Sequence, residues 1–264
     1  MSEIRIYAKL AASYVRSSMQ HRASFAMSVV RNGISSFGDL ARLMLLGFSF
    51  GALGGWSQAE IAVLYGIITV SFTLANAVGS SLFHFGKLVK SGEFDRLLMR
   101  TCQLLTQVMG WRFDLTRFGR LSMGLIGLVW GIVNQPEAFG LQQYLMVAVC
   151  ILSGILLFMG VLMMQGATCF WTIESNEAFN AITYGGISMA SYPLEIYQNW
   201  LKELFLYVIP LGFLNYLPCI VLFDKAMSYP AWMAYMGPVA GGLFLCVGLL
   251  IWKLGVRHYR STGS

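Results

Sequence analysis

Long runs without a charged residue constrain this chain more than any other feature. Such runs cover 23 residues at 61–83, 20 residues at 204–223 and 27 residues at 226–252. A helix rises about 1.5 Å per residue and the hydrocarbon core of a bilayer is about 30 Å thick, so about 20 apolar residues are enough to cross it. Each of the three runs is therefore predicted to be a transmembrane helix.

Three further spans are less regular. One is placed at 144–170, inside a run of 36 uncharged residues at 138–173. A short span at 118–133 requires Arg120 to extend its head group toward the membrane surface. The first span, at 25–56, is interrupted by charged residues. Only 11% of all residues are charged, against about 25% in a soluble domain. We therefore predict an all-α, polytopic membrane protein with six transmembrane helices.

The distribution of basic residues predicts the orientation, because cytoplasmic loops carry an excess of Lys and Arg. With both termini cytoplasmic, 15 of the 18 basic residues fall in cytoplasmic segments of a multi-pass inner-membrane protein. A seventh span at 178–194 would move the basic C-terminal tail outside, and this segment is weakly apolar, so we reject it. The net charge of +6 is then an orientation signal, and no nucleic-acid partner is expected.

The segment at 1–22 is expected to be a cytoplasmic interfacial helix, because its apolar residues recur at helical spacing opposite a basic face. Proline and asparagine interrupt the fifth span, at Pro210, Asn215 and Pro218. Such residues predict a kinked or broken helix.

The cytoplasmic loop at 84–117 contains a second amphipathic segment. Gly92 breaks the chain before a short charged stretch, which consists of Glu93, Phe94, Asp95 and Arg96. The acidic residues occupy the first turn, where the helix dipole favours them. We predict a short helix that packs its apolar face on the membrane spans and offers its charged face to a partner, with Phe94 as the anchor in a partner pocket. A plain interfacial connector is the alternative.

A second cytoplasmic loop is predicted at 171–202. It carries Glu174 and Glu177 where a basic excess would be usual. Both a solvated turn and a docking surface are compatible with these two residues.

Residue patterns typical of catalysis or of cofactor binding are hard to find. The segment at 81–88 looks like a phosphate-binding loop but has neither its first glycine nor the terminal Ser or Thr that would hold magnesium. The three histidines and five cysteines are scattered along the chain, so neither a metal site nor a disulfide framework is indicated. We expect no catalytic, cofactor-binding or metal-binding residue on this chain.

Asp39 and Arg42 form a candidate intramembrane charge pair. They are three residues apart and can meet on one helical face. Charges in hydrocarbon cost several kcal/mol unless they pair or face water. We favour a self-satisfied pair turned toward other helices over a substrate contact.

Several local runs, in this order, carry a family resemblance. They are Gly54-Gly55-Trp56, Leu64-Tyr65-Gly66, Gly92 to Leu98, Arg112-Phe113-Asp114-Leu115, Tyr192 to Tyr197, Ile209-Pro210, Asn215-Tyr216, Pro218 and Tyr259 to Ser264. Together they resemble the membrane subunits of type-2 ATP-binding cassette (ABC) transporters. One departure is Arg100-Thr101, where the family usually has Arg-Pro, so the first cytoplasmic helix is free to run on.

The resemblance implies a six-span permease that pairs with a second membrane subunit, either a copy of itself or a related permease, and with two cytosolic ATP-binding subunits. ATP and magnesium would be bound by those ATPases, and the segment from Gly92 to Arg96 would be the coupling helix that docks them. The mostly apolar and aromatic residues of the predicted pathway indicate a hydrophobic or amphiphilic export substrate. A secondary transporter and a non-transporting membrane assembly protein are the alternatives, although only Asp39 and Arg42 qualify as ion-coupling groups inside a span.

Overall fold

The computed structural model describes residues 3–20, 22–50, 53–172, 179–226 and 228–259. Among them, helices form all of the regular structure apart from one isolated bridge between Leu53 and Trp56, as the all-α class predicts. The longer helices are α1 (Glu3–Met19), α2 (Arg22–Phe50), α3 (Gln58–Phe83), α7 (Phe118–Val133), α8 (Leu141–Thr168) and α14 (Gly237–His258). The shorter ones are α4 (Phe85–Lys90), α5 (Glu93–Leu98), α6 (Leu104–Trp111), α10 (Gly186–Ala190), α11 (Asn199–Glu203), α12 (Leu211–Leu214) and α13 (Tyr216–Leu222).

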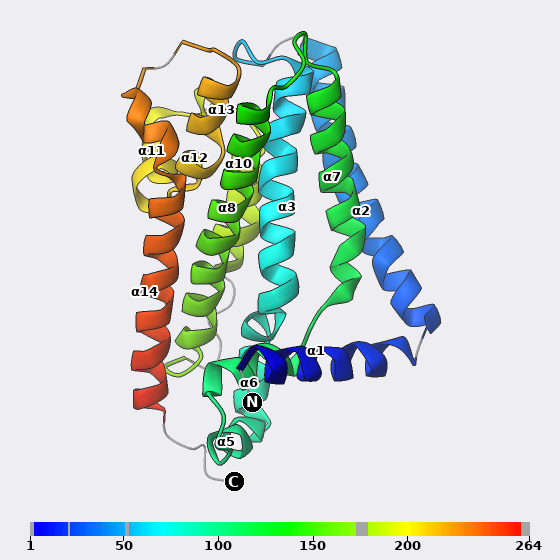
Figure 1. Ribbon diagram of the computed structural model, residues 1–264, viewed down its shortest axis with the longest axis vertical. Coiled ribbons are helices and arrows are strands. Elements are labelled where there is room, and N and C mark those ends of the chain that lie inside the picture. Colours follow the sequence, from blue (N-terminus) through cyan, green and yellow to red (C-terminus); the bar gives the residue numbers. More distant parts are fainter. Residues whose placement is uncertain (1–2, 21, 51–52, 173–178, 227, 260–264) are drawn as a thin grey trace.

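Helix α3 is the centre of the molecule. It is buried along almost its whole length, and it packs against α7 on one side and α8 on the other. Helix α2 covers the outer side of α7, and α14 covers α8, so that the five long helices stand side by side (Figure 1). Of the described helices, α1 runs across one end of this layer.

Glycines bring these helices close together. A Cβ atom on Gly248 of α14 would lie 2.6 Å from the carbonyl oxygen of Gly160 on α8, and one on Gly119 of α7 would lie 2.7 Å from the amide nitrogen of Gly33 on α2. In lipid there is no hydrophobic drive between helices, so close van der Waals packing at small residues is what holds them together. The two helix pairs therefore depend on these positions.

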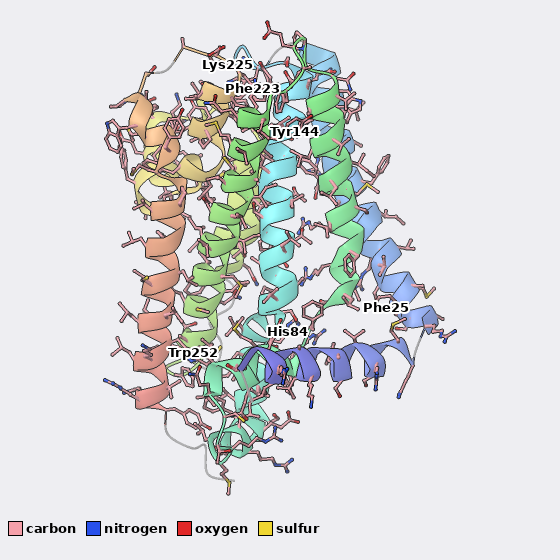
Figure 2. The ribbon with its side chains drawn as sticks, viewed as in Figure 1. Phe25, His84, Tyr144, Phe223, Lys225 and Trp252 are labelled. Carbon is pink, nitrogen blue, oxygen red and sulfur yellow. The ribbon has the colours of Figure 1, made fainter. Side chains whose placement is uncertain are left out.

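The layer has two ends, which we name by residues. At the α5 end lie α1, α4, α5, α6 and the last turn of α14, and Tyr259 beyond α14 donates a hydrogen bond to Asp95 on α5 (3.0 Å). At the Trp56 end lie the start of α3 and Lys225 (Figure 2). Lys225 forms an ion pair with Glu60 (2.9 Å) and lies over the Trp56 ring (4.8 Å). The first described helix, α1, and the last turn of α14 lie at the same end of the layer, which agrees with an even number of crossings.

Three helices in the described part of the chain are long and apolar enough to cross a membrane: α3 with its continuation to Lys90, α8 and α14. A bent pair, Asn199–Val208 with Leu211–Leu222, would make a fourth if it were one span. Helix α2 packs along α7 but carries charges, and α7 has only 16 residues. The predicted total of six spans therefore stays a prediction.

The chain runs from one end of the layer to the other between residues 171 and 196. Trp171 stacks on His258 at the α5 end, with ring centroids 5.9 Å apart. Ile196 lies at the Trp56 end, where its Cγ2 atom would be 3.5 Å from a Cβ atom on Gly54. The described part of the segment at 178–194, which we rejected as a span, thus runs along the long helices, an arrangement that differs from the predicted cytoplasmic loop at 171–202.

The predicted fifth span at 204–223 does not cross. Its two halves are bent by 72°, and it returns to the Trp56 end, where the ring centroids of Tyr216 and Phe223 lie 6.0 and 6.1 Å from Trp56. Asn215 sits at the break and donates to the carbonyl oxygens of Leu64 (3.1 Å) and Ala190 (2.7 Å). The break that Pro210 and Asn215 predict therefore makes a re-entrant hairpin.

The exchange of these two segments has a physical reason. The crossing near α10 packs on α3 and on the hairpin, and Ile187 and Ala190 are buried there. A segment covered by protein does not need the apolarity that contact with lipid demands. Since one crossing replaces the other, the predicted topology with both termini on one side is unaffected.

Candidate functional site

Helix α5 is the candidate docking helix, and its start is set by Gly92. This residue has a φ of 69°, a left-handed conformation that favours glycine. The turn directs the chain back toward the long helices, and Glu93 and Asp95 follow in the first turn of α5. The predicted short helix after Gly92 is thus present in the structure.

Phe94 does not have the position that we predicted for it. Its side chain is 0% exposed, and its ring lies 5.1 Å from Phe85, 5.5 Å from Phe170 and 4.8 Å from Tyr259, measured between centroids. A ring that is fully covered by its own chain cannot reach into a partner pocket. The prediction of Phe94 as the intermolecular anchor is therefore wrong, because its apolar side chain packs inward.

Five aromatic residues around Phe94 form what we call the aromatic cluster: Phe85, Phe94, Phe170, Trp252 and Tyr259. They come from α4, α5, the turn after α8, α14 and the residue after α14. Most pairs meet edge to face, an arrangement worth about 0.5–1.5 kcal/mol beyond area burial. The cluster fixes α5 to the ends of two long helices.

The exposed face of α5 differs from the predicted one. Glu93 and Arg96 are exposed, as expected. Asp95 instead faces Tyr259, and burial together with this hydrogen bond raises the pKa of Tyr259 to about 12. Two residues that sequence reasoning did not include, Leu98 and Met99, have exposures of 44% and 87%. Their apolarity at the end of a charged turn was the available signal.

The helix does not run on where the proline is missing. Helix α5 ends at Leu98 and α6 begins at Leu104, with a turn across Arg100 and Thr101 between them. Burial of Leu97 on one side and Val108 on the other holds both short helices against the chain. Tertiary packing thus breaks the helix without proline.

The predicted pair of Asp39 and Arg42 is present but incomplete. The two side chains lie 3.9 Å apart, while Arg120 on α7 approaches Asp39 more closely, at 3.6 Å. The Arg120 guanidinium also lies 5.7 Å from the ring centre of Phe72 and 5.8 Å from that of Tyr184. Arg120 therefore joins the pair and does not extend to the membrane surface as predicted.

Arg42 is the open member of this charge cluster, which consists of Asp39, Arg42 and Arg120. Its side chain is 70% exposed, whereas that of Arg120 is 19% exposed. An arginine in the middle of a helix at the edge of an apolar layer is costly in lipid. Its open side therefore has to meet water or another protein.

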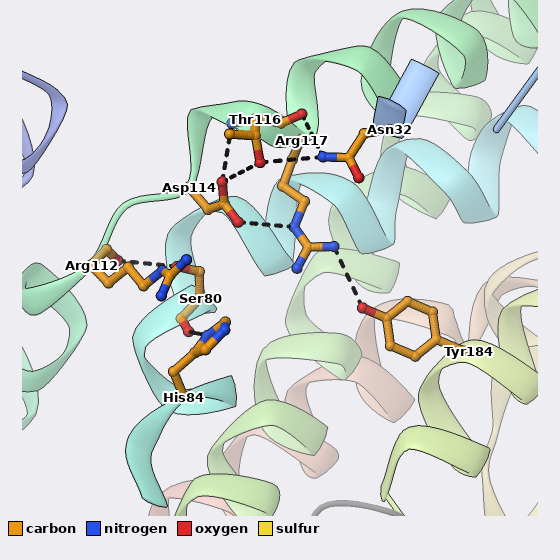
Figure 3. Close-up of polar contacts among 8 residues, drawn as sticks. All are labelled: Asn32, Ser80, His84, Arg112, Asp114, Thr116, Arg117 and Tyr184. Atoms are coloured by element: carbon orange, nitrogen blue, oxygen red, sulfur yellow. Dashed lines mark hydrogen bonds and ion pairs between the residues drawn. The ribbon is translucent and has the colours of Figure 1, made fainter. Parts of the chain in front are cut away.

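The segment from Arg112 to Arg117 forms a polar network at the α5 end (Figure 3). Asn32 on α2 donates to the carbonyl oxygen of Thr116 (2.9 Å), and Arg117 lies 3.4 Å from Asp114. The Arg117 guanidinium also donates to the hydroxyl of Tyr184 (3.4 Å). The network connects α2, α7 and the crossing segment near α10.

Asp114 is the acceptor at the centre of this network. Burial disfavours its charged form, but the hydrogen bonds from Thr116 and the charges of Arg117 and Arg112 outweigh burial. The pKa of Asp114 therefore lies below its usual value. Two hydroxyls from α3 hold the neighbouring backbone: Ser80 and Ser81 both donate to the carbonyl oxygen of Arg112, at 3.3 and 2.8 Å.

The remaining predicted residues need only brief comment. Glu174 and Glu177 lie outside the described residues. In the part of the chain that the structure describes, no group of three or more His, Cys, Asp and Glu could hold a metal ion. The absence of catalytic and cofactor-binding residues from this chain remains a prediction.

The chain has the fold of a polytopic helical membrane protein: a layer of apolar helices holds a short charged helix at one end. Within this class, residues 34–263 match the family described as ABC-2 family transporter protein. The match covers most of the chain, so the chain belongs to this family of ABC transporter permeases, as the sequence runs indicated. Comparison with curated proteins and with solved structures gave no match.

Membership describes the chain as the membrane component of a transport system and not as its catalytic component. It also implies that ATP-binding subunits are the partners. Helix α5 lies beyond the end of the long helices, where a subunit outside the membrane could contact it (Figure 1).

Proposed function

We propose that this chain is the transmembrane subunit of an ATP-driven exporter in the bacterial inner membrane. Two cytosolic subunits would bind ATP and magnesium and hydrolyse ATP, and a second permease, identical or related, would complete the pathway. The substrate class that we propose is hydrophobic or amphiphilic. The observation that carries the proposal is the aromatic cluster, which fixes α5 to the long helices while leaving one face of α5 open.

The proposed mechanism is mechanical. Closure of the ATP-binding subunits would push on α5, and the aromatic cluster would pass this displacement to α4, and so to α3, and to α14. A transition between inward-open and outward-open states requires that the ATPases contact the two states differently. A rigid connection from α5 to α3 supports such a difference, because a loosely attached helix would absorb the displacement.

The proposed docking surface consists of Glu93, Arg96, Leu98 and Met99. The two apolar side chains would supply most of the affinity, since truncation of a central buried contact costs about 2 kcal/mol or more. The two charges lie at the rim, where water and salt screen them, and would act mainly on specificity.

The open side of the charge cluster supports a second membrane subunit. Arg42 projects from α2, whose neighbouring apolar residues Ile34, Phe37 and Leu45 are exposed as well. A partner permease that covers this face would bury the apolar residues and leave Arg42 facing a shared, hydrated pathway. Lipid would offer Arg42 neither water nor a counter-charge.

The test is co-purification with the ATP-binding subunit from mild detergent. We expect the complex to hydrolyse ATP and the chain alone to show no hydrolysis above background. Replacing Leu98 and Met99 together with Asp should reduce the co-purified ATPase at least about tenfold, whereas Glu137→Lys at the Trp56 end should leave it unchanged. Unchanged association in the double variant and in Glu93→Lys with Arg96→Glu would move the docking role to the segment around Glu174.

A further inference from the structure

A cavity of about 380 Å³ opens at the α5 end, where α1, the first three turns of α2, the end of α3 and the segment from Arg112 to Arg117 meet. We call it the arginine cavity, because Arg31, Arg112 and Arg117 all line it. The permease function described above makes no use of it. It also contains the run Arg112-Phe113-Asp114-Leu115, which the sequence comparison singled out without giving it a role.

Positive charge is in excess around this cavity. Three arginines face a single carboxylate, that of Asp114, which leaves an excess of two positive charges apart from His84. Asp114 already accepts from Thr116 and pairs with Arg117. Its single negative charge therefore cannot balance all three arginines.

Arg117 and Arg112 both have a buried Nε atom that, among the described residues, has no hydrogen-bond partner. Arg117 forms an ion pair with Asp114, whereas the charge of Arg112 acts on this carboxylate only at longer range. The backbone of Arg112, in contrast, is held by Ser80 and Ser81. A partly buried guanidinium group without an anion is unfavourable, whereas one that meets a phosphate forms strong bidentate hydrogen bonds. The backbone thus presents the side chain to the cavity in a fixed position.

The cavity also has an apolar side. Tyr14 from α1, Phe25 from α2 and Phe113 line it together with the arginines. Figure 2 shows Phe25 and His84 at about the same level, close to α1. Further along α2, the side chains of Met27 and Val30 are 75% and 57% exposed, as expected where hydrocarbon begins. The cavity therefore lies where the head group and the first carbons of an amphiphile would be found.

From this geometry we infer that the arginine cavity binds the phosphate-bearing head group of an anionic amphiphile in the leaflet that contacts α1. Basic pockets between helices on the cytoplasmic side are suited to anionic lipid head groups. The phosphate would meet Arg112 and Arg31, and the glycerol and first methylene groups would contact Phe25 and Phe113. The chains would continue along the exposed face of α2.

The experiment uses the purified full chain in detergent and measures lipid binding by native mass spectrometry. Phosphatidylglycerol should bind about tenfold more tightly than phosphatidylcholine, and Arg112→Gln should remove this preference. Arg31→Gln, in an exposed residue, is the second variant and should weaken binding as well, which protects the test against a folding defect in Arg112→Gln. Arg16→Gln, on an exposed position of α1 outside the cavity, is the matched control and should bind as the parent chain does.

Competition by glycerol 3-phosphate distinguishes the sources of phosphate. Without displacement at millimolar concentration, the ligand is a lipid; with displacement, the cavity recognises a soluble phosphate ester by the same arginines. The inference is overturned if Arg112→Gln and Arg31→Gln both bind phosphatidylglycerol as the parent does. It is also overturned if the parent chain binds phosphatidylglycerol no more tightly than phosphatidylcholine and does not bind glycerol 3-phosphate. Because transport plays no part in these measurements, failure here leaves the proposed function standing.

Discussion

The aromatic cluster and the arginine cavity lie at the same end of the molecule but are built in opposite ways. In the cluster, Phe85 and Phe94 are fully buried and touch other rings on several sides. In the cavity, arginines surround about 380 Å³ of space and Arg112 has a buried nitrogen without a partner. The contacts of the aromatic cluster are satisfied within the chain, whereas the arginine cavity has space and positive charge for a ligand.

This difference separates structural support from recognition. A closed apolar cluster loses stability when any member is removed, because a cavity remains. A polar cavity with excess charge gains stability when a ligand enters, since binding to the native state alone stabilises it. We therefore expect substitutions in the cluster to affect folding first, and substitutions in the cavity to affect ligand binding first.

The largest effect is expected for Phe94→Ala. Removing a fully buried aromatic ring should lower the free energy of unfolding by about 3–5 kcal/mol. Leu98→Ala on the exposed face of the same helix is the control and should change stability little. Thermal unfolding in detergent measures both. A Phe94→Ala chain of normal stability that has lost ATPase association would restore the intermolecular anchor that the structure argues against.

A slightly smaller effect is expected between α8 and α14, whose spacing positions Trp252 and Tyr259 in the cluster. Gly248→Ala places a Cβ atom 2.6 Å from the backbone oxygen of Gly160, and it should destabilise the chain by about 3 kcal/mol. Gly242→Ala, on the same helix with nothing within 4 Å of the new atom, should be neutral. Equal melting temperatures for the two variants would show that the helices do not pack as described.

The smallest effect is expected for Asp114→Asn beside the cavity. Loss of the carboxylate leaves Arg117 without its ion pair and should cost about 2 kcal/mol near neutral pH. Because the pKa of Asp114 is lowered in the folded state, its charge stabilises the fold above its unfolded pKa of about 4. This contribution is lost as the pH falls through the folded pKa.

The difference in stability between the parent chain and Asp114→Asn should therefore shrink on acidification. Melting temperatures measured from pH 7 to pH 3 show whether it does. A difference that stays constant or grows in acid would mean that the carboxylate is not the stabilising group of the network.

The features that the sequence predicted correctly depend on a long uncharged run or on a single glycine. The uncharged run at 61–83 lies in α3, the last part of the run at 226–252 lies in α14 from Gly237 on, and Gly92 marks the start of α5. Charge and length suffice for such spans, because a helix of about 20 uncharged, mostly apolar residues can cross the hydrocarbon core whether lipid or protein surrounds it.

The sequence failed where the surroundings of a segment decide its role. The run at 204–223 is apolar enough to cross, yet the hydrogen bonds of Asn215 to Leu64 and Ala190 hold it as a hairpin. Amphipathic spacing identified Phe94, but spacing does not tell whether an apolar side chain meets its own chain or a partner. Arg120 was assigned to the surface because its partner, Asp39, lies on another helix.

The most direct test of the central claim is to ask what touches α5 in the assembled transporter. Met99, which is 87% exposed, is replaced by the photoreactive residue p-benzoylphenylalanine, and Glu137 at the opposite end is replaced in a control. We predict that irradiation of intact membranes crosslinks the cytosolic ATP-binding subunit to position 99 and not to position 137. Crosslinking of that subunit to position 137, or its absence at position 99 in a complex that still hydrolyses ATP, would contradict the account.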